Sequence, residues 1–377
     1  MDLLAINPFD SIWNALTLIV PFLLVMTIIV FFHELGHFAV ARFFGVQVVS
    51  FSIGFGREII GWTDKHGTRW KIGWLPLGGY VKFIDDDDPA SVSAAGEDAA
   101  AAPGSFRGKP LWQRALIVAA GPIANFILAI LIFAGLYTTT GVVVLEPVVS
   151  QVMENSPAEK AGIKPGDRIV AIDGEKVDNF LDISRIVALR AGREVEVVVK
   201  RGERLLTLRV RLGERERPDG IGGKVKVGFL GVMHDASGGI RFERKGPLEA
   251  LALGAKSTWN IVSGTMTYLK EMVIGRQSAN QLAGPIRIAQ MSQKAAETSI
   301  LMLFQLAAVL SVSIGLINLF PIPMLDGGHL LYYAIEAVRG KPLSESAQEF
   351  GFRIGIALVL ALMLVATFND IMHLFSR

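Results

Sequence analysis

The chain has 377 residues, of which 51% are hydrophobic and only 19% charged. This composition indicates a membrane protein with a water-exposed part, and the length allows two or three domains. The 37 basic and 35 acidic residues give a formal net charge of +2, so the charge balance gives no reason to expect nucleic acid binding. Cysteine is absent, which excludes disulfides, thiolate zinc ligands and a cysteine nucleophile; any metal must be held by histidine and carboxylate.

The first apolar run carries a metal-binding motif. No charged residue occurs from Ser11 to Phe32, and the pentapeptide HELGH, with His33, Glu34 and His37, follows at once. In a helix these two histidines lie one turn apart on one face, where both can bind one metal, and Glu34 can take a proton from the water beside it. Such groups are costly at membrane depth, about 2.5–3.5 kcal/mol for a central charge. We therefore expect residues 1–44 to form a retained transmembrane helix that carries an active site.

The next two segments differ in composition. Residues 45–83 alternate and are rich in Val, Ile, Phe, Trp and Gly, which predicts a strand-rich, membrane-associated segment with β-hairpins. Residues 84–110 contain the acidic run Asp85–Asp88 and an Ala/Ser/Gly/Pro tract. That composition predicts a flexible cytosolic linker in which the acidic run is solvated.

Three further runs can cross a bilayer, which takes about 20 apolar residues. They predict a second transmembrane helix at 111–140, a third at 298–329 and, after a cytosolic loop at 330–353, a fourth with the tail at 354–377. Lys and Arg are absent before the first run, whereas nine lie between HELGH and Ala115, where the uncharged part of the second run begins. Because cytoplasmic loops are enriched in these residues, we expect the N-terminus outside and residues from about 141 to 297 outside as well.

Residues 141–213 have the pattern of a compact α/β module. The run SPAEKAGIKPGDRIVAIDG within it resembles a PDZ domain, a fold that binds extended peptides or C-termini by strand addition. Gly228–Gly231 is either a carboxylate-binding loop or, as we favour, a buried strand with flanking glycines. The rest of the extracytoplasmic segment, 214–297, is predicted to contain amphipathic helices. One of them, at 247–275, lies either on the outer membrane surface or against the module.

HExxH alone leaves the third metal ligand open. Glu58 lies 21 residues beyond His37, a spacing similar to that of soluble metalloproteases, but it falls in a strand-like stretch. Asp326 is the first charge after 28 uncharged residues and follows Pro321 and Pro323, which break the third span. The first and third spans both run inward, so HELGH and Asp326 are expected at a similar depth. Asp326 is therefore favoured over Glu58 and over His329, which we interpret as a polar residue at the interface.

HELGH in the first span, GPIAN at 121–125, the PDZ-like module and NLFPIPMLDGGH at 318–329 together resemble the site-2 protease family, in particular its bacterial regulator-of-sigma-E type. The resemblance covers nearly the whole chain. It implies Zn²⁺ held by His33, His37 and Asp326, with Glu34 as the base and a role for Asn318 near the substrate backbone or oxyanion. GPIAN is either catalytic or, as we favour, a close-packing site. Two features depart from the family pattern: only one PDZ-like module is found, and Ser313 stands where some members carry Asn.

The sequence thus predicts a polytopic α-helical membrane protein with about four transmembrane helices, a membrane-associated β-hairpin region and one extracytoplasmic PDZ-like α/β domain. The expected activity is that of an intramembrane zinc metalloendopeptidase in the bacterial inner membrane, with its active site near the cytosolic side. The resemblance implies single-span membrane proteins as substrates, such as anti-sigma factors or remnant signal peptides. Two alternatives remain: a membrane-anchored metallopeptidase that cuts soluble or unfolded proteins, and a PDZ scaffold with a degenerate site, against which the intact Glu34 argues.

Overall fold

The computed structural model describes residues 8–85, 103–218, 224–234, 241–275 and 283–375. Most of the predicted linker at 84–110 lies outside these ranges. The chain divides into two compact units. The first comprises residues 1–134, 251–262 and 282–370, and the second comprises residues 135–250, 263–281 and 371–377. Each unit is described by itself below.

Within the part of the chain that the structure describes, four helices are long and apolar enough to cross a membrane: α1 (Pro8–Phe43), α3 (Leu111–Thr139), α8 (Ile300–Asn318) and α10 (Glu345–Phe375). Many of their large apolar side chains are exposed, as is expected of surfaces that face lipid. The prediction of about four helices able to span a membrane is confirmed by their length and composition. Two boundaries differ, since α10 begins nine residues before the predicted 354, and the third helix ends at Asn318 rather than near 329.

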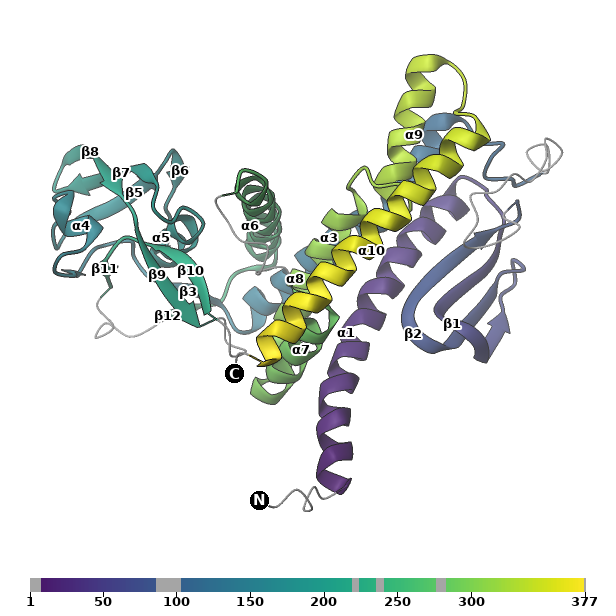
Figure 1. Ribbon diagram of the computed structural model, residues 1–377, viewed down its shortest axis with the longest axis horizontal. Coiled ribbons are helices and arrows are strands. Elements are labelled where there is room, and N and C mark those ends of the chain that lie inside the picture. The colour runs from purple at the N-terminus through teal and green to yellow at the C-terminus, as the bar shows by residue number, and fades with distance from the viewer. Residues whose placement is uncertain (1–7, 86–102, 219–223, 235–240, 276–282, 376–377) are drawn as a thin grey trace. The chain divides into compact units, whose positions relative to one another are not determined.

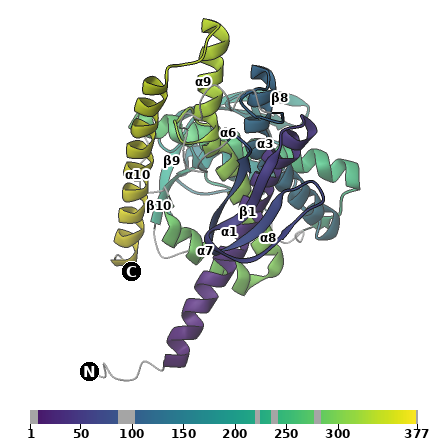
Figure 2. The ribbon, with the colours of Figure 1, turned by 90° about the vertical axis from the view of Figure 1, so that its right-hand side faces the viewer.

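Two shorter helices join these spans in the first unit. α7 (Pro285–Thr298) leads into α8, and α9 (Asp326–Arg339) leads into α10 through the left-handed Gly340 (Figure 2). The N-terminus of α7 has no side-chain cap of its own. Instead the buried carboxylate of Asp370 on α10 accepts hydrogen bonds from the backbone N–H groups of Gly284 and Arg287, both at 3.0 Å. This contact ties the end of α10 to the start of α7.

A long antiparallel hairpin, β1 (Val48–Thr63) and β2 (Arg69–Phe83), lies along α1 in Figure 1, which confirms the strand-rich segment. An aromatic cluster fixes it to the helix: the ring of Phe51 lies 4.4 Å from that of Trp70 and 5.5 Å from that of Phe38 on α1. Beyond β2, Asp85 is buried, and its carboxylate accepts hydrogen bonds from the Ser105 hydroxyl and the Arg107 backbone, both at 2.7 Å. For this first aspartate the predicted solvated loop is wrong, because three chain groups take the place of water.

The second unit contains an α/β module built on a four-stranded antiparallel sheet in the order β6-β5-β7-β8. The sheet strands are β5 (Arg168–Ile172), β6 (Glu175–Lys176), β7 (Glu194–Arg201) and β8 (Arg204–Arg211). Short pairs flank it: β3 (Val142–Val144) with β12 (Arg241–Glu243), β4 (Gln151–Val152) with β11 (Val232–Met233), and β9 (Gly213–Pro218) with β10 (Lys224–Phe229). The helices are α4 (Pro157–Lys160) and α5 (Phe180–Ala188).

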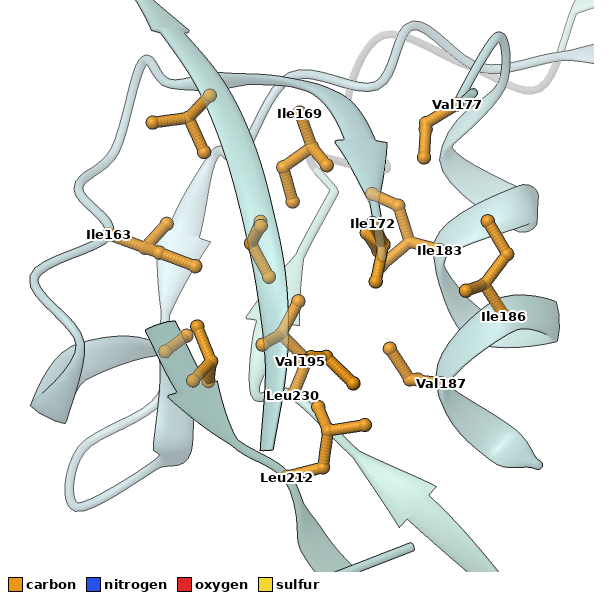
Figure 3. Close-up of a cluster of buried hydrophobic side chains, with 14 of the residues drawn as sticks. Ile163, Ile169, Ile172, Val177, Ile183, Ile186, Val187, Val195, Leu212 and Leu230 are labelled. Atoms are coloured by element: carbon orange, nitrogen blue, oxygen red, sulfur yellow. The ribbon is translucent and has the colours of Figure 1, made fainter. Parts of the chain in front are cut away.

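One hydrophobic core holds the module together (Figure 3). The inward residues of β5 and β7, such as Ile169 and Val197, meet Ile183, Ile186 and Val187 on one face of α5. Asp173 and Gly174 both have positive φ in the turn between β5 and β6, a backbone conformation typical of tight hairpin turns. The predicted α/β module is therefore found, while its assignment to the PDZ fold remains a prediction. Gly228 and Phe229 are the last two residues of β10, and Leu230, which follows them, is buried in the core.

The predicted amphipathic helix is α6 (Pro247–Val273). Its residues are shared between the two units. In the first unit, Gly254 packs closely on α3. A Cβ atom added to Gly254 would lie 2.7 Å from the carbonyl oxygen of Ile130. Trp259 and Val273 are exposed, so the helix keeps an apolar surface. Its expected place on the membrane surface stays a prediction.

Candidate metal centre

The HELGH motif lies within α1, so its two histidines are neighbours on one helix face, as their spacing predicts. The Nε2 atoms of His33 and His37 are 3.2 Å apart, and both side chains are mostly buried. The Nδ1 atom of His37 lies 2.9 Å from the carbonyl oxygen of Ile117 on α3. Because a carbonyl only accepts, His37 carries its proton on Nδ1 and directs the lone pair of Nε2 toward His33.

Small residues allow α3 to approach this face of α1. A Cβ on Gly121 would overlap the imidazole of His37 and lie 2.9 Å from Cε1 of His33. On the other side, Gly36 packs against the backbone of Ala120 and the side chain of Ala124. His37 faces Ile117 whereas His33 faces Asn125, so α1 and α3 run antiparallel. The GPIAN segment therefore acts as a close-packing site, as predicted.

The third group of the cluster is Asp326. Its Oδ2 lies 3.1 Å from Nε2 of His33, and its Oδ1 lies 3.6 Å from Nε2 of His37. Oδ2 is buried, and no described residue hydrogen-bonds to it. Among the described residues, the potential metal-binding group consists of these three side chains, whose ligand atoms lie within 4.8 Å of one another.

Asp326 does not close the third span but begins a new helix. After α8 ends at Asn318, residues 319–325 form a tight loop, and proline at 321 and 323 removes two backbone donors. A side chain on Gly327 would overlap the carbonyl oxygens of Leu319 and Phe320, and one on Gly328 would overlap that of Ile322. These glycines let the loop fold back onto the first turn of α9. The loop thus turns Asp326 toward α1.

The surrounding structure constrains this loop and the helix that follows it. α10 packs directly on it, because Gly355 presents no side chain to the carbonyl group of Pro323. Met324, two residues before Asp326, has φ +105°, a conformation that residues other than glycine rarely adopt. Such a backbone persists only where the surroundings impose it. Near the far end of α9, Glu336 receives a 2.6 Å ion pair from Arg114 on α3.

Glu34 lies where the hairpin meets α1. A Cβ on Gly79 of β2 would stand 2.9 Å from Cγ of Glu34. The carboxylate of Glu34 also accepts a hydrogen bond from the backbone of Val81. The proposed base is therefore held between the metal-binding helix and a strand.

The other predicted candidates are not part of the cluster. Glu58 lies on β1, and its carboxylate pairs with Arg69 at 2.5 Å. His329 lies one turn along α9 from Asp326, and Asn318 is the half-buried last residue of α8. The Ser313 hydroxyl donates to the backbone of Val309 in its own helix. The Ile117 carbonyl and the side chain of Asn125 were not predicted, because neither a backbone oxygen nor an amide within a small-residue motif has a metal-site signature.

The donor set fits zinc. Imidazole nitrogen and carboxylate oxygen are common zinc ligands, and three protein ligands with an open fourth position typify catalytic sites. Ligand atoms about 2.0–2.1 Å from a tetrahedral zinc are about 3.3 Å apart. The two Nε2 atoms are 3.2 Å apart, and each has one oxygen of the Asp326 carboxylate nearby, at 3.1 Å for His33 and 3.6 Å for His37. When bound, zinc supplies Lewis acidity that lowers the pKa of water to about 7 and polarises a peptide carbonyl.

Comparison with known proteins agrees with this chemistry. The model of peptidase family M50 matches residues 21–362. A protein of Agrobacterium fabrum, named as a candidate zinc metalloprotease, is 51% identical over 364 residues, which cover 94% of this chain and 96% of that protein. Metalloprotease MmpA of Caulobacter vibrioides is 41% identical over 384 residues, with 94% and 96% covered. The chain therefore belongs to peptidase family M50, the site-2 protease family, and is a zinc metalloprotease integral to a membrane.

Proposed function

We propose that the protein is an intramembrane zinc metalloprotease that hydrolyses peptide bonds within the transmembrane segments of single-span proteins. The observation that carries this proposal is the position of the His33, His37 and Asp326 cluster. The two histidines belong to a candidate membrane span, Trp13–Phe43, and they face the middle of another, Leu111–Thr139. A substrate must therefore enter between apolar helices to reach them.

In this mechanism Glu34 takes the proton from the attacking water and later delivers it to the nitrogen of the leaving amine. His33, His37 and Asp326 hold the zinc, and Asn318 donates to the oxyanion that develops on the scissile carbonyl. The contact with β2 supports the role of Glu34, because it fixes a carboxylate that lies one residue after His33 and three residues before His37 in the same helix. The Asn318 role rests on its position at the end of α8, just before the loop that presents Asp326.

A helical substrate must unwind before its peptide bonds can be attacked, since its carbonyls are otherwise hydrogen-bonded. The β1–β2 hairpin offers a partner for the unwound segment. Its inner strand touches Glu34 through Gly79 and Val81, so a substrate strand paired with the hairpin would lie beside the base. This mode of binding is strand addition.

The distribution of basic residues supports an orientation for this site. Nine Lys and Arg side chains lie between HELGH and residue 115, and none precedes α1 within the sequence. We place the N-terminus outside, the hairpin in the cytosol and the active site near the cytosolic side of the bacterial inner membrane. The α/β module then lies outside, where as a PDZ-like domain it can bind a peptide or a C-terminus of substrates such as trimmed anti-sigma factors or remnant signal peptides.

The alternative of a membrane-anchored metallopeptidase for soluble proteins gains no support from the site. That alternative requires Glu58 as the third metal ligand, but the Glu58 carboxylate forms an ion pair with Arg69.

Glu34→Gln tests the proposed mechanism. The amide keeps the shape of the carboxylate but accepts no proton, so cleavage of a single-span substrate in proteoliposomes should fall by about 10²–10⁴-fold or more while zinc stays bound. Membrane stubs should accumulate in cells that carry this variant. Near-normal turnover by the purified variant would contradict the assignment of Glu34.

A further inference from the structure

Asn125 on α3 is a fully buried polar residue next to the proposed metal centre. Its relative exposure is 0%, and its side-chain amide nitrogen lies 3.3 Å from Nδ1 of His33. Its amide oxygen is buried and has no hydrogen-bond partner among the described residues. A buried amide in a stripe of small residues is expected to have a specific partner.

The partner of Asn125 can be inferred from the protonation that His33 needs in order to bind a metal. An imidazole that binds a metal through Nε2 carries its proton on Nδ1, and that proton needs an acceptor. The nitrogen and oxygen of an amide are almost identical in shape, and a 180° rotation exchanges them. With the oxygen facing His33, the 3.3 Å contact becomes a hydrogen bond that Nδ1–H donates to Asn125.

We propose that Asn125 is a positioning residue that fixes the tautomer and the orientation of His33, so that Nε2 is its ligand atom. This inference rests on the proposed metal centre at His33, His37 and Asp326. It assigns to α3 a role for both histidines, since the Ile117 carbonyl already accepts from His37. Ile117, Gly121 and Asn125 are spaced by four residues and therefore lie on one face of α3. On this face the Ile117 carbonyl is the acceptor for His37, Gly121 leaves space for the two imidazole rings, and Asn125 is the proposed acceptor for His33.

α8 packs against the backbone and Cβ of Asn125. The Ser311 hydroxyl donates to the backbone oxygen of Asn125 at 2.8 Å, and a Cβ on Gly315 would stand 3.2 Å from Cβ of Asn125. These contacts concern the backbone and Cβ of Asn125, not its amide. Ser311→Ala therefore provides a control that disturbs the same packing without removing the proposed acceptor.

The test compares three variants of the full chain in detergent: Asn125→Asp, Asn125→Leu and Ser311→Ala. Zinc affinity is measured by competition with a chelator, and the site geometry is followed by the visible absorption of bound Co²⁺. A carboxylate can only accept, so Asn125→Asp should keep zinc affinity and the Co²⁺ spectrum. Asn125→Leu has a similar shape but no acceptor, and it should bind zinc about 10–100-fold more weakly with an altered spectrum. Ser311→Ala should stay within about twofold of the unmodified chain.

Three results would overturn the proposal: unchanged zinc affinity in Asn125→Leu, an equal loss in Asn125→Asp and Asn125→Leu, or an equal loss in Ser311→Ala. The second result would mean that the amide donates to His33 instead of accepting. His33→Ala is measured alongside, because it separates this inference from the metal centre. If the unmodified chain and His33→Ala bound zinc equally, the centre itself would be wrong, whatever the Asn125 variants did.

Discussion

Asp167 and Arg201 form a buried ion pair in the α/β module. Arg201 donates from Nε and Nη2 to the two carboxylate oxygens at 2.7 and 2.8 Å, and the backbone N–H of Lys164 adds a third bond at 2.8 Å. Burial raises the pKa of Asp167, but the hydrogen bonds from Arg201 and Lys164 outweigh it and hold this pKa below its usual value. The pair therefore stabilises the folded module at neutral pH.

Arg201→Met should destabilise the module at neutral pH, because it leaves the buried carboxylate of Asp167 without its charged partner. The measurement is hydrogen exchange of the β5 and β7 amides in the full chain, corrected for the intrinsic exchange rate. Arg209→Met is the matched control, because Arg209 and Glu196 form an exposed contact at 4.0 Å whose loss should cost less than about 1 kcal/mol.

The same pair predicts a pH dependence. A carboxyl group whose pKa is lowered on folding stabilises the fold above its unfolded pKa, about 3.9, and this contribution is lost as the pH falls through the folded value. The difference between the unmodified chain and Arg201→Met should therefore shrink below about pH 4. A difference that stayed constant down to pH 2 would show that the ion pair is not its source.

At the scale of elements, the site depends on how α10 packs on the loop before Asp326. Gly355 allows this contact with Pro323, and the hydroxyl of Tyr332 on α9 closely approaches Gly351 of α10. α10 thus contacts the loop through Gly355 and contacts α9 through Gly351. The glycines of α10 set the distance between a membrane helix and the segment that presents a metal ligand.

Gly355→Ala should displace the loop, since the added methyl group would overlap the carbonyl oxygen of Pro323. A shift of about 1 Å in a catalytic group costs on the order of 10²-fold in rate, so kcat/KM for a short membrane substrate should fall by that order. Ala357→Val, on an exposed part of the same helix, should leave kcat/KM nearly unchanged. Similar effects of both substitutions would mean that the packing of α10 on the loop does not position Asp326.

The elements were largely predictable because each has a strong local pattern. Long uncharged runs predict α1, α3 and α8, and alternation with glycine predicts the β1–β2 hairpin. The end of α8 was misplaced because hydropathy continues through residues 319–325 although the helix does not. The two prolines indicated a break, but the start of α9 at Asp326 depends on Gly327 and Gly328 fitting against loop carbonyls. That is a tertiary contact with no periodic signal.

The candidate site was predictable to a similar degree. HExxH spacing brings His33 and His37 together by helix geometry alone, and the shared depth of two spans selected Asp326 over Glu58. The structure brings these three side chains together. The partner of His37 is a backbone oxygen, which sequence cannot specify, and the proposed role of Asn125 depends on the antiparallel approach of α3. Sequence motifs thus identified the proposed ligand residues, whereas the contacts between α1 and α3 that support them could be found only in the structure.

At the scale of the whole molecule, the orientation in the membrane is the main prediction from charge. With the N-terminus outside, residue 213 lies outside and residue 94 lies in the cytosol. Alkaline phosphatase, which is active only outside the cytoplasmic membrane, should be active when fused after Gly213 and inactive when fused after Ala94. The opposite pattern would reverse the orientation and place the active site near the outer face.

The most direct test of the account is the zinc content of the full chain after single substitutions of the two rival carboxylates. Zinc per chain is measured by inductively coupled plasma mass spectrometry on protein purified without chelators. The unmodified chain and Glu58→Gln should each hold about one zinc per chain, whereas Asp326→Asn should lose most of it together with activity. Retention of zinc by Asp326→Asn and its loss in Glu58→Gln would contradict the metal centre described here.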